Sequence, residues 1–392
     1  MTTPAFLDIH AVQALPFANI NRDDLGAPKT VVFGGAERTR VSSQSWKRMI
    51  RKHVEEQVGE RTVRTRRVVR GVAERLKAQG WEDAEAEAAG IQVAVSAGGK
   101  GIKLESDKDD ADKVVLTTSV LLLLPEAGID ELAELAAAHR EVILAEAKRA
   151  KKPTDVKAKL PTDEVDAILS RRSGTINLFG RMLAELPGAN VDGAVQVAHA
   201  FTTHGTQVEY DFFTAVDDVE KALEIPGSGH MNTGMFSAGT FYRYANINLT
   251  DLARNLDGDT DLAASLVTGF LDGFINTVPT GKQTATAPTT PPDLVHIAVR
   301  DDRPVSMATA FEAPVWGNRG HLVTSVQRLH THAEALNRLL GQAHRLLGGH
   351  IAAPPAFGSE EPQPLGAFGD RHESYDDLVH AAVAGAYPEA AR

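Results

Sequence analysis

The segment from Ser42 to Val58 carries the pattern that most restricts how this chain can fold. Its apolar side chains recur at helical spacing on one side, and its cations fall on the other side. The apolar side comprises Trp46, Met49, Ile50 and Val54, and the basic side comprises Lys47, Arg48, Arg51 and Lys52. Serines precede the stripe and can cap the free N–H groups of the first turn. The pattern predicts a helix that buries one face and exposes a basic one.

Strand patterns surround this helix and predict an α+β fold. Residues 5–15 read as a first strand, and further strands are expected at 194–203, 240–249 and 294–299. Helices are expected over 259–278 and 322–347, and 280–292 is expected to be a loop because it is rich in Thr and Pro. Residues 205–238 form an excursion that is longer than a structural turn needs, which favours a functional role.

Residues 59–166 differ in composition from their flanks and predict a mainly helical insertion. They are rich in Ala and Glu, with a helix expected over 130–150 and an exposed acidic loop over 105–112. The domains expected are therefore a discontinuous body of 1–58 and 167–345, the insertion 59–166, the excursion 205–238 and a tail. The tail, 346–392, is rich in Pro and Gly and carries a short helix near 374–385.

The composition narrows the classes of function. The chain has no cysteine, which excludes disulfides, thiolate metal sites and cysteine nucleophiles. The most apolar run, 114–124, is too short to cross a bilayer, which needs about 20 residues. The N-terminus shows no basic region followed by an apolar run. We therefore expect a soluble, cytoplasmic protein that does not contact membrane.

The charge distribution points to a polyanion despite a net charge of −11. Residues 38–75 hold twelve Lys and Arg against four Glu, so this window carries +8. Affinity for nucleic acid follows such a local footprint rather than the total charge. A helix N-terminus, hydroxyl donors and a basic face coincide here, which favours binding of a phosphate backbone over a merely solvated helix face.

Other candidate motifs carry weaker signals. Asp23 and Asp24 are paired carboxylates of the kind that can bind a metal, but in a loop with Gly and Pro they are more often turn residues. The spacing of His199 and His204 does not place both on one face, so we expect no metal site and no cofactor. Residues 241–244, Phe-Tyr-Arg-Tyr, suit either base stacking or core packing, and the sequence does not separate the two.

Six blocks of sequence resemble the CasC family, the RNA-binding backbone subunit of the type I-E CRISPR Cascade complex. They appear in the family's order and extend over about the first two-thirds of the chain. The blocks are LPFANINRDD (15–24), VFGGAERTRVSSQSWKR (32–48), FGRMLA (179–184), VQVAHAFTTH (195–204), DFFTAVDD (211–218) and TFYRYANINL (240–249).

The resemblance implies a fold shaped like a right hand and a function without catalysis. The palm would be an RNA-recognition-like (ferredoxin-like) domain, the insertion 59–166 the helical fingers, and the excursion 205–238 a β-hairpin thumb that reaches a neighbouring copy. Copies would form a helical filament along CRISPR RNA, together with other Cascade subunits, and present guide bases to target DNA for antiviral defence.

The resemblance also implies the residues that contact RNA. Eight would hold its backbone: Arg22, Lys29, Arg40, Ser42, Gln44, Lys47, Arg48 and Arg51. Met182 would wedge against bases, and the thumb residues Thr214 and Met231 would lie where bases are displaced. Two alternatives stay open: an endonuclease that cuts target RNA with a metal held by Asp23 and Asp24, and a monomeric nucleic-acid-binding module.

Overall fold

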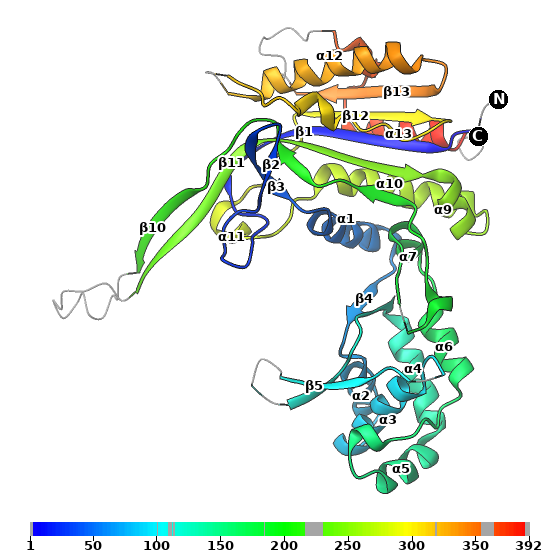
Figure 1. The fold of residues 1–392 in the computed structure, drawn as a ribbon. Coiled ribbons are helices and arrows are strands. Elements are labelled where there is room, and N and C mark those ends of the chain that lie inside the picture. Colours follow the sequence, from blue (N-terminus) through cyan, green and yellow to red (C-terminus); the bar gives the residue numbers. More distant parts are fainter. Residues whose placement is uncertain are drawn as a thin grey trace, which may run out of the picture. The chain divides into compact units, whose positions relative to one another are not determined.

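The computed structural model describes residues 3–99, 101–108, 112, 114–183, 185–215, 230–317, 320–353 and 364–388. Figure 1 shows the fold, which divides into two compact units. The first unit comprises Met1–Val54, Val195–Ala253 and Asp259–Arg392, and the second comprises Glu55–Ala194 and Arg254–Gly258. The predicted insertion, 59–166, and residues 167–194 both fall in the second unit.

A large, mostly antiparallel sheet forms the body of the first unit, and the fold is therefore of the mixed α and β class. Its main path runs β14-β13-β12-β1-β11-β9-β3-β2, and β8 and β10 also pair with β11. The strands are β1 (Phe6–Ala18), β2 (Thr30–Phe33), β3 (Ala36–Val41), β8 (Val195–Val197), β9 (Ala200–Thr202), β10 (Glu209–Ala215), β11 (His230–Asn248), β12 (Leu294–Arg300), β13 (Arg345–Ala352) and β14 (Asp370–Arg371).

Strand β1 lies in the interior of this sheet because both of its edges are paired with other strands. It pairs antiparallel with β11 on one side and with β12 on the other, so that Ile9 faces Ala245 and Ile297. Leu7, Ile9, Ala11 and Val12 are fully buried. The strand predicted over 5–15 is therefore the central strand of the core.

Helices cover the two faces of the sheet. On one face, α12 (Leu322–Leu340) and η3 (Ala308–Phe311) pack against Val12, Tyr242 and Leu294. On the other face, α1 (Ser43–Val58) and α10 (Thr260–Asn276) enclose the guanidinium of Arg243. Helix α13 (Tyr375–Ala386) packs beside α10 and against β13. The view in Figure 1 shows α12 above the sheet and α1 with α10 below it.

Strand β11 continues beyond the sheet as one arm of a hairpin. It is 19 residues long, and its first part pairs antiparallel with β10 from Glu209↔Phe236 to Ala215↔His230. The strand predicted over 240–249 is thus the second half of β11, and the described part of the predicted excursion is a β-hairpin.

The second unit combines short helices with two small sheets. Its core joins α2, α3, α4 and α6 with strand β7, through residues such as Val72, Leu76, Leu124, Leu132 and Val165. The helices are α2 (Val68–Ala78), α3 (Asp83–Ser96), α4 (Ala127–Ala138), α5 (Arg140–Arg149), α6 (Thr162–Ser170) and α7 (Gly174–Phe179), with the 3-10 turns η1 (Pro153–Asp155) and η2 (Pro187–Ala189). The sheets pair β4 (Thr62–Thr65) with β7 (Leu122–Pro125), and β5 (Leu104–Lys108) with β6 (Val114–Thr118).

Several element predictions need correction. Part of the expected acidic loop, 105–108, is strand β5, because the Val and Thr of β6 supply a partner strand. The helix expected over 130–150 is two helices that meet at His139. The helix expected over 322–347 ends at Leu340, where Gly341 adopts a φ of +73° that helices do not continue. Strand β13 follows, so part of the expected tail belongs to the sheet.

Shorter elements complete the description. They are α9 (Leu249–Asn255), α11 (Gln283–Thr286) within the expected loop, and η5 (Gly366–Phe368). Within the described ranges, every helix is too short or too polar to span a lipid bilayer.

Candidate nucleic-acid interface

Helix α1 presents a polar face because its apolar face is fixed in the first unit. Trp46, Ile50 and Val54 are buried, and the ring of Trp46 lies 3.7 Å from the guanidinium carbon of Arg243. The opposite residues remain accessible: Gln44, Arg48 and Lys52 are exposed, and Lys47 and Arg51 are half-buried. Burial lowers the pKa of the Lys47 ammonium, so a phosphate partner would favour its charged form.

The side chain of Asn21 attaches the loop before β2 to the residue that precedes α1. The Ser42 N–H donates to Oδ1 of Asn21 at 2.8 Å, and the Lys29 N–H donates to the carbonyl of Asn21 at 3.0 Å. Arg22 forms an isolated bridge with Pro28 and is exposed. Arg22, Lys29 and α1 are therefore held in one part of the unit. The Ser42 side chain is only 8% exposed, so it offers less to a ligand than the sequence suggested.

Lys29 and Arg40 form a cationic cluster beside this loop, and the imidazole of His199 lies against Arg40. The Arg40 N–H donates to the carbonyl of Lys29 at 2.8 Å, and Arg40 Nη1 lies 3.1 Å from Nδ1 of His199. Partial burial and the charges of Arg40 and Lys29 lower the pKa of His199. Sequence reasoning considered His199 only as a metal ligand. The structure places it between β8 and β9, next to Arg40 of β3, and its spacing in the sequence does not show this position.

The carboxylate of Asp23 stabilises the loop. Its Oδ1 accepts the N–H groups of Leu25 at 3.0 Å and Ala27 at 2.8 Å, as a turn residue does. Asp23 and Asp24 line an open, polar depression of about 500 Å³ together with Arg22. Among the described residues there is no group of three or more His, Asp or Glu side chains that is arranged to hold a metal.

Much of the basic window has structural partners. Arg38 is fully buried and donates to the carbonyls of Thr202 at 2.8 Å and Phe311 at 3.1 Å. In the second unit, Arg70 pairs with Glu74 and Arg75 with Asp130. Fewer residues of the first unit therefore carry accessible positive charge than the count over 38–75 implied. They lie on α1 and in the cluster of Lys29 and Arg40.

The aromatic segment 241–244 belongs to the core. Phe241, Tyr242 and Arg243 are each at most 3% exposed. The hydroxyl of Tyr242 accepts the Met307 N–H at 3.0 Å and lies 2.9 Å from Nδ1 of His10. These side chains are covered and cannot stack on bases, which resolves the two readings in favour of core packing.

The hairpin places the two predicted thumb positions opposite each other. Thr214 pairs with Met231 in register, and Thr214 is exposed; the side chain of Met231 lies outside the described part. Sequence reasoning missed three neighbours on β10: Tyr210, Phe212 and Phe213 are 71%, 60% and 46% exposed. Exposed aromatics on a protruding hairpin are typical of a surface that contacts a partner.

Met182 lies in the second unit and is 84% exposed. The residues on either side are anchored: Arg181 is 4% exposed and pairs with Val191, and the Leu183 N–H donates to Oδ1 of Asn190 at 2.6 Å. A large apolar side chain is thus presented to solvent from a fixed backbone.

Similarity to known proteins identifies the family of this chain. The sequence profile of the CT1975-like proteins matches residues 7–361. A chain of the solved structure "CRISPR RNA-guided surveillance complex, pre-nicking" is 51% identical, with a TM-score of 0.87 over 97% of this chain and 100% of that chain. A chain of "CRISPR RNA-guided surveillance complex" is 45% identical, with a TM-score of 0.78 over 97% and 99%. Curated proteins give no match. Since the profile covers most of its length, this chain belongs to the CT1975-like protein family.

Proposed function

We propose that this chain is the RNA-binding backbone subunit of a CRISPR RNA-guided surveillance complex of type I-E, equivalent to CasC. Its similarity to chains of such complexes extends over nearly the whole length of both partners. The observation that carries the proposal is the basic face of α1, continued by Lys29, Arg40 and His199 on one rigid unit. That surface suits a phosphate backbone, which needs charge along a path rather than a pocket.

The topology supports an RNA-recognition-like palm. In chain order, β1, α1, β9, β11, α10 and β12 form a β-α-β-β-α-β succession. Their spatial order is β12-β1-β11-β9, with α1 and α10 on the same face. A ferredoxin-like domain would have this arrangement, and the second unit would then be an insertion between α1 and β9.

The same topology explains how RNA would be held. RNA-recognition domains stack bases on the sheet face opposite their helices. Here that face is covered by α12 and η3, which pack on Tyr242 and Leu294. The guide would therefore be held by its phosphates on the cations beside the sheet, and its base edges would stay free to pair with target DNA.

The protruding hairpin supports assembly with further copies. Strand β10 exposes aromatics and two carboxylates, Glu209 and Asp211, and no cation. Such a strand does not attract a phosphate backbone and is better suited to a protein surface or to bases. A subunit of this kind needs no catalytic group, and Asp23 is already engaged in its own turn.

A double charge reversal on α1 tests the proposal. We expect Lys47→Glu with Arg51→Glu to abolish assembly on CRISPR RNA, because two cations become repulsive anions on the proposed phosphate path. Assembly is measured as particle mass by light scattering after size exclusion, with CRISPR RNA and again after ribonuclease. The parent protein should form a large particle that collapses towards 42.0 kDa when the RNA is digested.

A matched reversal separates the site from general charge. Arg303 and Arg338 are exposed, and Arg338 lies on α12, which covers the other face of the sheet from α1. Arg303→Glu with Arg338→Glu should assemble like the parent. Loss of folding by circular dichroism in the α1 variant would show that the face is structural, and a parent protein that stays monomeric with RNA would refute the function.

A further inference from the structure

The first unit contains a pocket of about 330 Å³ beside the basic face of α1. It lies between α1, the end of α10 and the loop that leads through α11 to β12. Its lining includes the apolar side chains of Met49, Ile275 and Val278 and the polar side chains of Thr280, Gln283 and Thr289. The pocket therefore combines an apolar surface with hydrogen-bonding groups.

Hydrogen bonds hold the loop that forms one wall of this pocket. The Thr290 hydroxyl donates to the carbonyl of Ala14 at 2.6 Å, and Nε2 of Gln13 donates to the carbonyl of Thr290, also at 2.6 Å. Both partners belong to β1, the central strand of the core. Lys282 and Ala287, which flank α11, have φ angles of +47° and +42° that residues with a side chain rarely adopt. The wall is thus attached to the sheet and has a defined shape.

The pocket adjoins the proposed RNA-binding surface on two sides. On α1, Met49 lies one helical turn from the exposed Lys52 of the basic face. On the loop, Thr280 lines the pocket, and its neighbour Gly281 lines the depression that contains Arg22. A strand whose phosphates lie on these cations would therefore have its bases beside the pocket.

We propose that the pocket binds one nucleobase of a single-stranded RNA that is held by its phosphates on α1. A nucleobase has apolar faces and polar edges, which match the two kinds of side chain in the lining. The volume is about twice that of a cavity of about 150 Å³ that binds benzene, so a purine fits. The inference rests on the proposed RNA-binding function and adds a contact to a base.

The polar lining suits bases of any identity. The hydroxyls of Thr280 and Thr289 and the amide of Gln283 each offer both a donor and an acceptor. None of these three side chains hydrogen-bonds to another described residue. They are therefore available to the edge of a purine or of a pyrimidine, which a guide of variable sequence requires.

A side chain of a partner protein explains this pocket less well. An apolar side chain would cover Met49 and Ile275, but it would leave the hydroxyls and the amide without partners, which is unfavourable. The basic face beside the pocket attracts phosphates, and the bases follow the phosphates along the strand.

Filling the pocket tests the contact on two oligonucleotides. The probes are a fluorescein-labelled oligoadenylate and an abasic oligomer of the same length, which keeps the phosphates and lacks the bases. Each is titrated by anisotropy against the full-length chain. We expect Thr280→Leu with Thr289→Leu to weaken the oligoadenylate about tenfold, because the leucines occupy the space of the base and remove two hydrogen-bonding groups. Binding of the abasic oligomer should not change.

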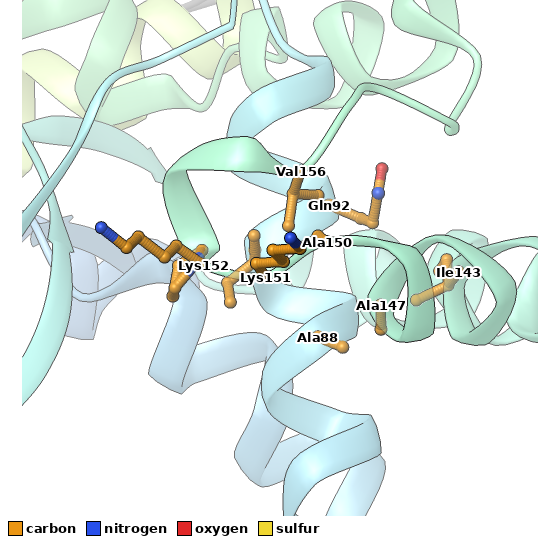
Figure 2. Close-up of a pocket in the computed structure, with 10 residues that line it drawn as sticks. Ala88, Gln92, Ile143, Ala147, Ala150, Lys151, Lys152 and Val156 are labelled. Atoms are coloured by element: carbon orange, nitrogen blue, oxygen red, sulfur yellow. The ribbon is translucent and has the colours of Figure 1, made fainter.

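Two control variants separate the pocket from added apolar surface. Thr260→Leu with Thr331→Leu makes the same substitutions at exposed positions outside the pocket and should bind both oligomers like the parent. Ala147→Phe fills another pocket, of about 180 Å³, in the second unit, where Figure 2 shows Ala88 on one helix and Ala147 on the other. It should also leave both affinities unchanged, and circular dichroism checks the folding of each variant.

The inference is wrong if the pocket variant binds the oligoadenylate like the parent, or if it weakens the abasic oligomer by the same factor. Unchanged affinity for the oligoadenylate together with weaker assembly would assign the pocket to a protein side chain instead. In both cases the parent still binds RNA, so the proposed function would stand. A parent protein that binds neither oligomer would refute that function as well.

Discussion

Arg181 provides a quantitative test of how the second unit positions Met182. Its buried guanidinium donates to four carbonyls through three nitrogens. Nε bonds Ala189 at 2.7 Å, Nη1 bonds Arg171 at 2.8 Å and Leu123 at 3.3 Å, and Nη2 bonds Ser170 at 2.7 Å. Burial lowers the pKa of Arg181. One planar group thus connects four separate backbone positions.

Arg181→Lys keeps the positive charge but removes the planar guanidinium and its several N–H donors. A lysine ammonium is a single point donor and cannot reach carbonyls spread around a planar guanidinium. We expect at least two of the four carbonyls to lose their partner, and each unpaired buried group costs about 1–3 kcal/mol. The free energy of unfolding of the second unit should fall by about 2–6 kcal/mol, which corresponds to a loss in Tm on the order of 10 °C.

Differential scanning calorimetry measures this loss in Tm, and two further variants serve as controls. Arg172 is exposed and follows Arg171, whose carbonyl accepts from Arg181. The variant Arg172→Lys should therefore melt like the parent. Met182→Ala should also melt like the parent, because Met182 is 84% exposed, yet it should weaken assembly on RNA if this side chain contacts bases. An Arg181→Lys protein that melts within about 1 °C of the parent would refute the role of the planar guanidinium.

Two other predictions concern the first unit. Burial lowers the pKa of His296 to about 3, so the folded state keeps the neutral form; its contribution to stability is present above pH 6.5 and is lost as pH falls below that value. His296→Gln should therefore reduce the loss of unfolding free energy between pH 7 and pH 5 by about 2 kcal/mol, measured by urea titration. Asp8 acts in the opposite direction, because its pKa is raised to about 6 and its protonation favours folding as pH falls. Trp46→Ala should lower the free energy of unfolding by about 3–5 kcal/mol, whereas Trp316→Ala, at an 81% exposed side chain, should change it little. Equal effects of the two tryptophan variants would contradict the position of Trp46 in the core.

The sequence predicted those elements whose pattern is local. Helix α1 could be predicted because its apolar stripe and its serines lie within about four turns, and strand β1 because its apolar residues alternate loosely over 5–15. The length of the excursion 205–238 predicted only a functional role, and its hairpin form was implied by the family resemblance. Strand β5 was missed because a charged run reads as a loop until β6 is placed beside it.

The candidate site was predicted in part, and the reason lies in what surrounds each cation. A count of charges treats Arg38 and Arg48 alike, but Arg38 is buried against backbone carbonyls and Arg48 is exposed. His199 joins the cluster only through the pairing of β3 with β9 and of β8 with β11. Burial and cross-strand neighbours depend on contacts distant in sequence, which a one-dimensional pattern does not contain.

The burial of three arginines limits how the proposed RNA binding can work. Arg38, Arg181 and Arg243 are buried and donate to backbone carbonyls and, for Arg243, also to Gln13. Their positive charges are therefore not accessible to a ligand, in a chain whose net charge is −11. If the chain binds RNA as proposed, the attraction must come from direct contacts rather than from the overall electrostatic field of the protein. Six cations are proposed to make them: Arg22, Lys29, Arg40, Lys47, Arg48 and Arg51. Displacement of six counterions from single-stranded RNA predicts a slope of log K against log salt of about −4 per copy. Removing one contact, as in Arg48→Gln, should reduce the slope by about 0.7. A slope near zero in the parent protein would mean that RNA is held without these phosphate contacts, and the assignment of α1 as the backbone-binding face would have to be abandoned.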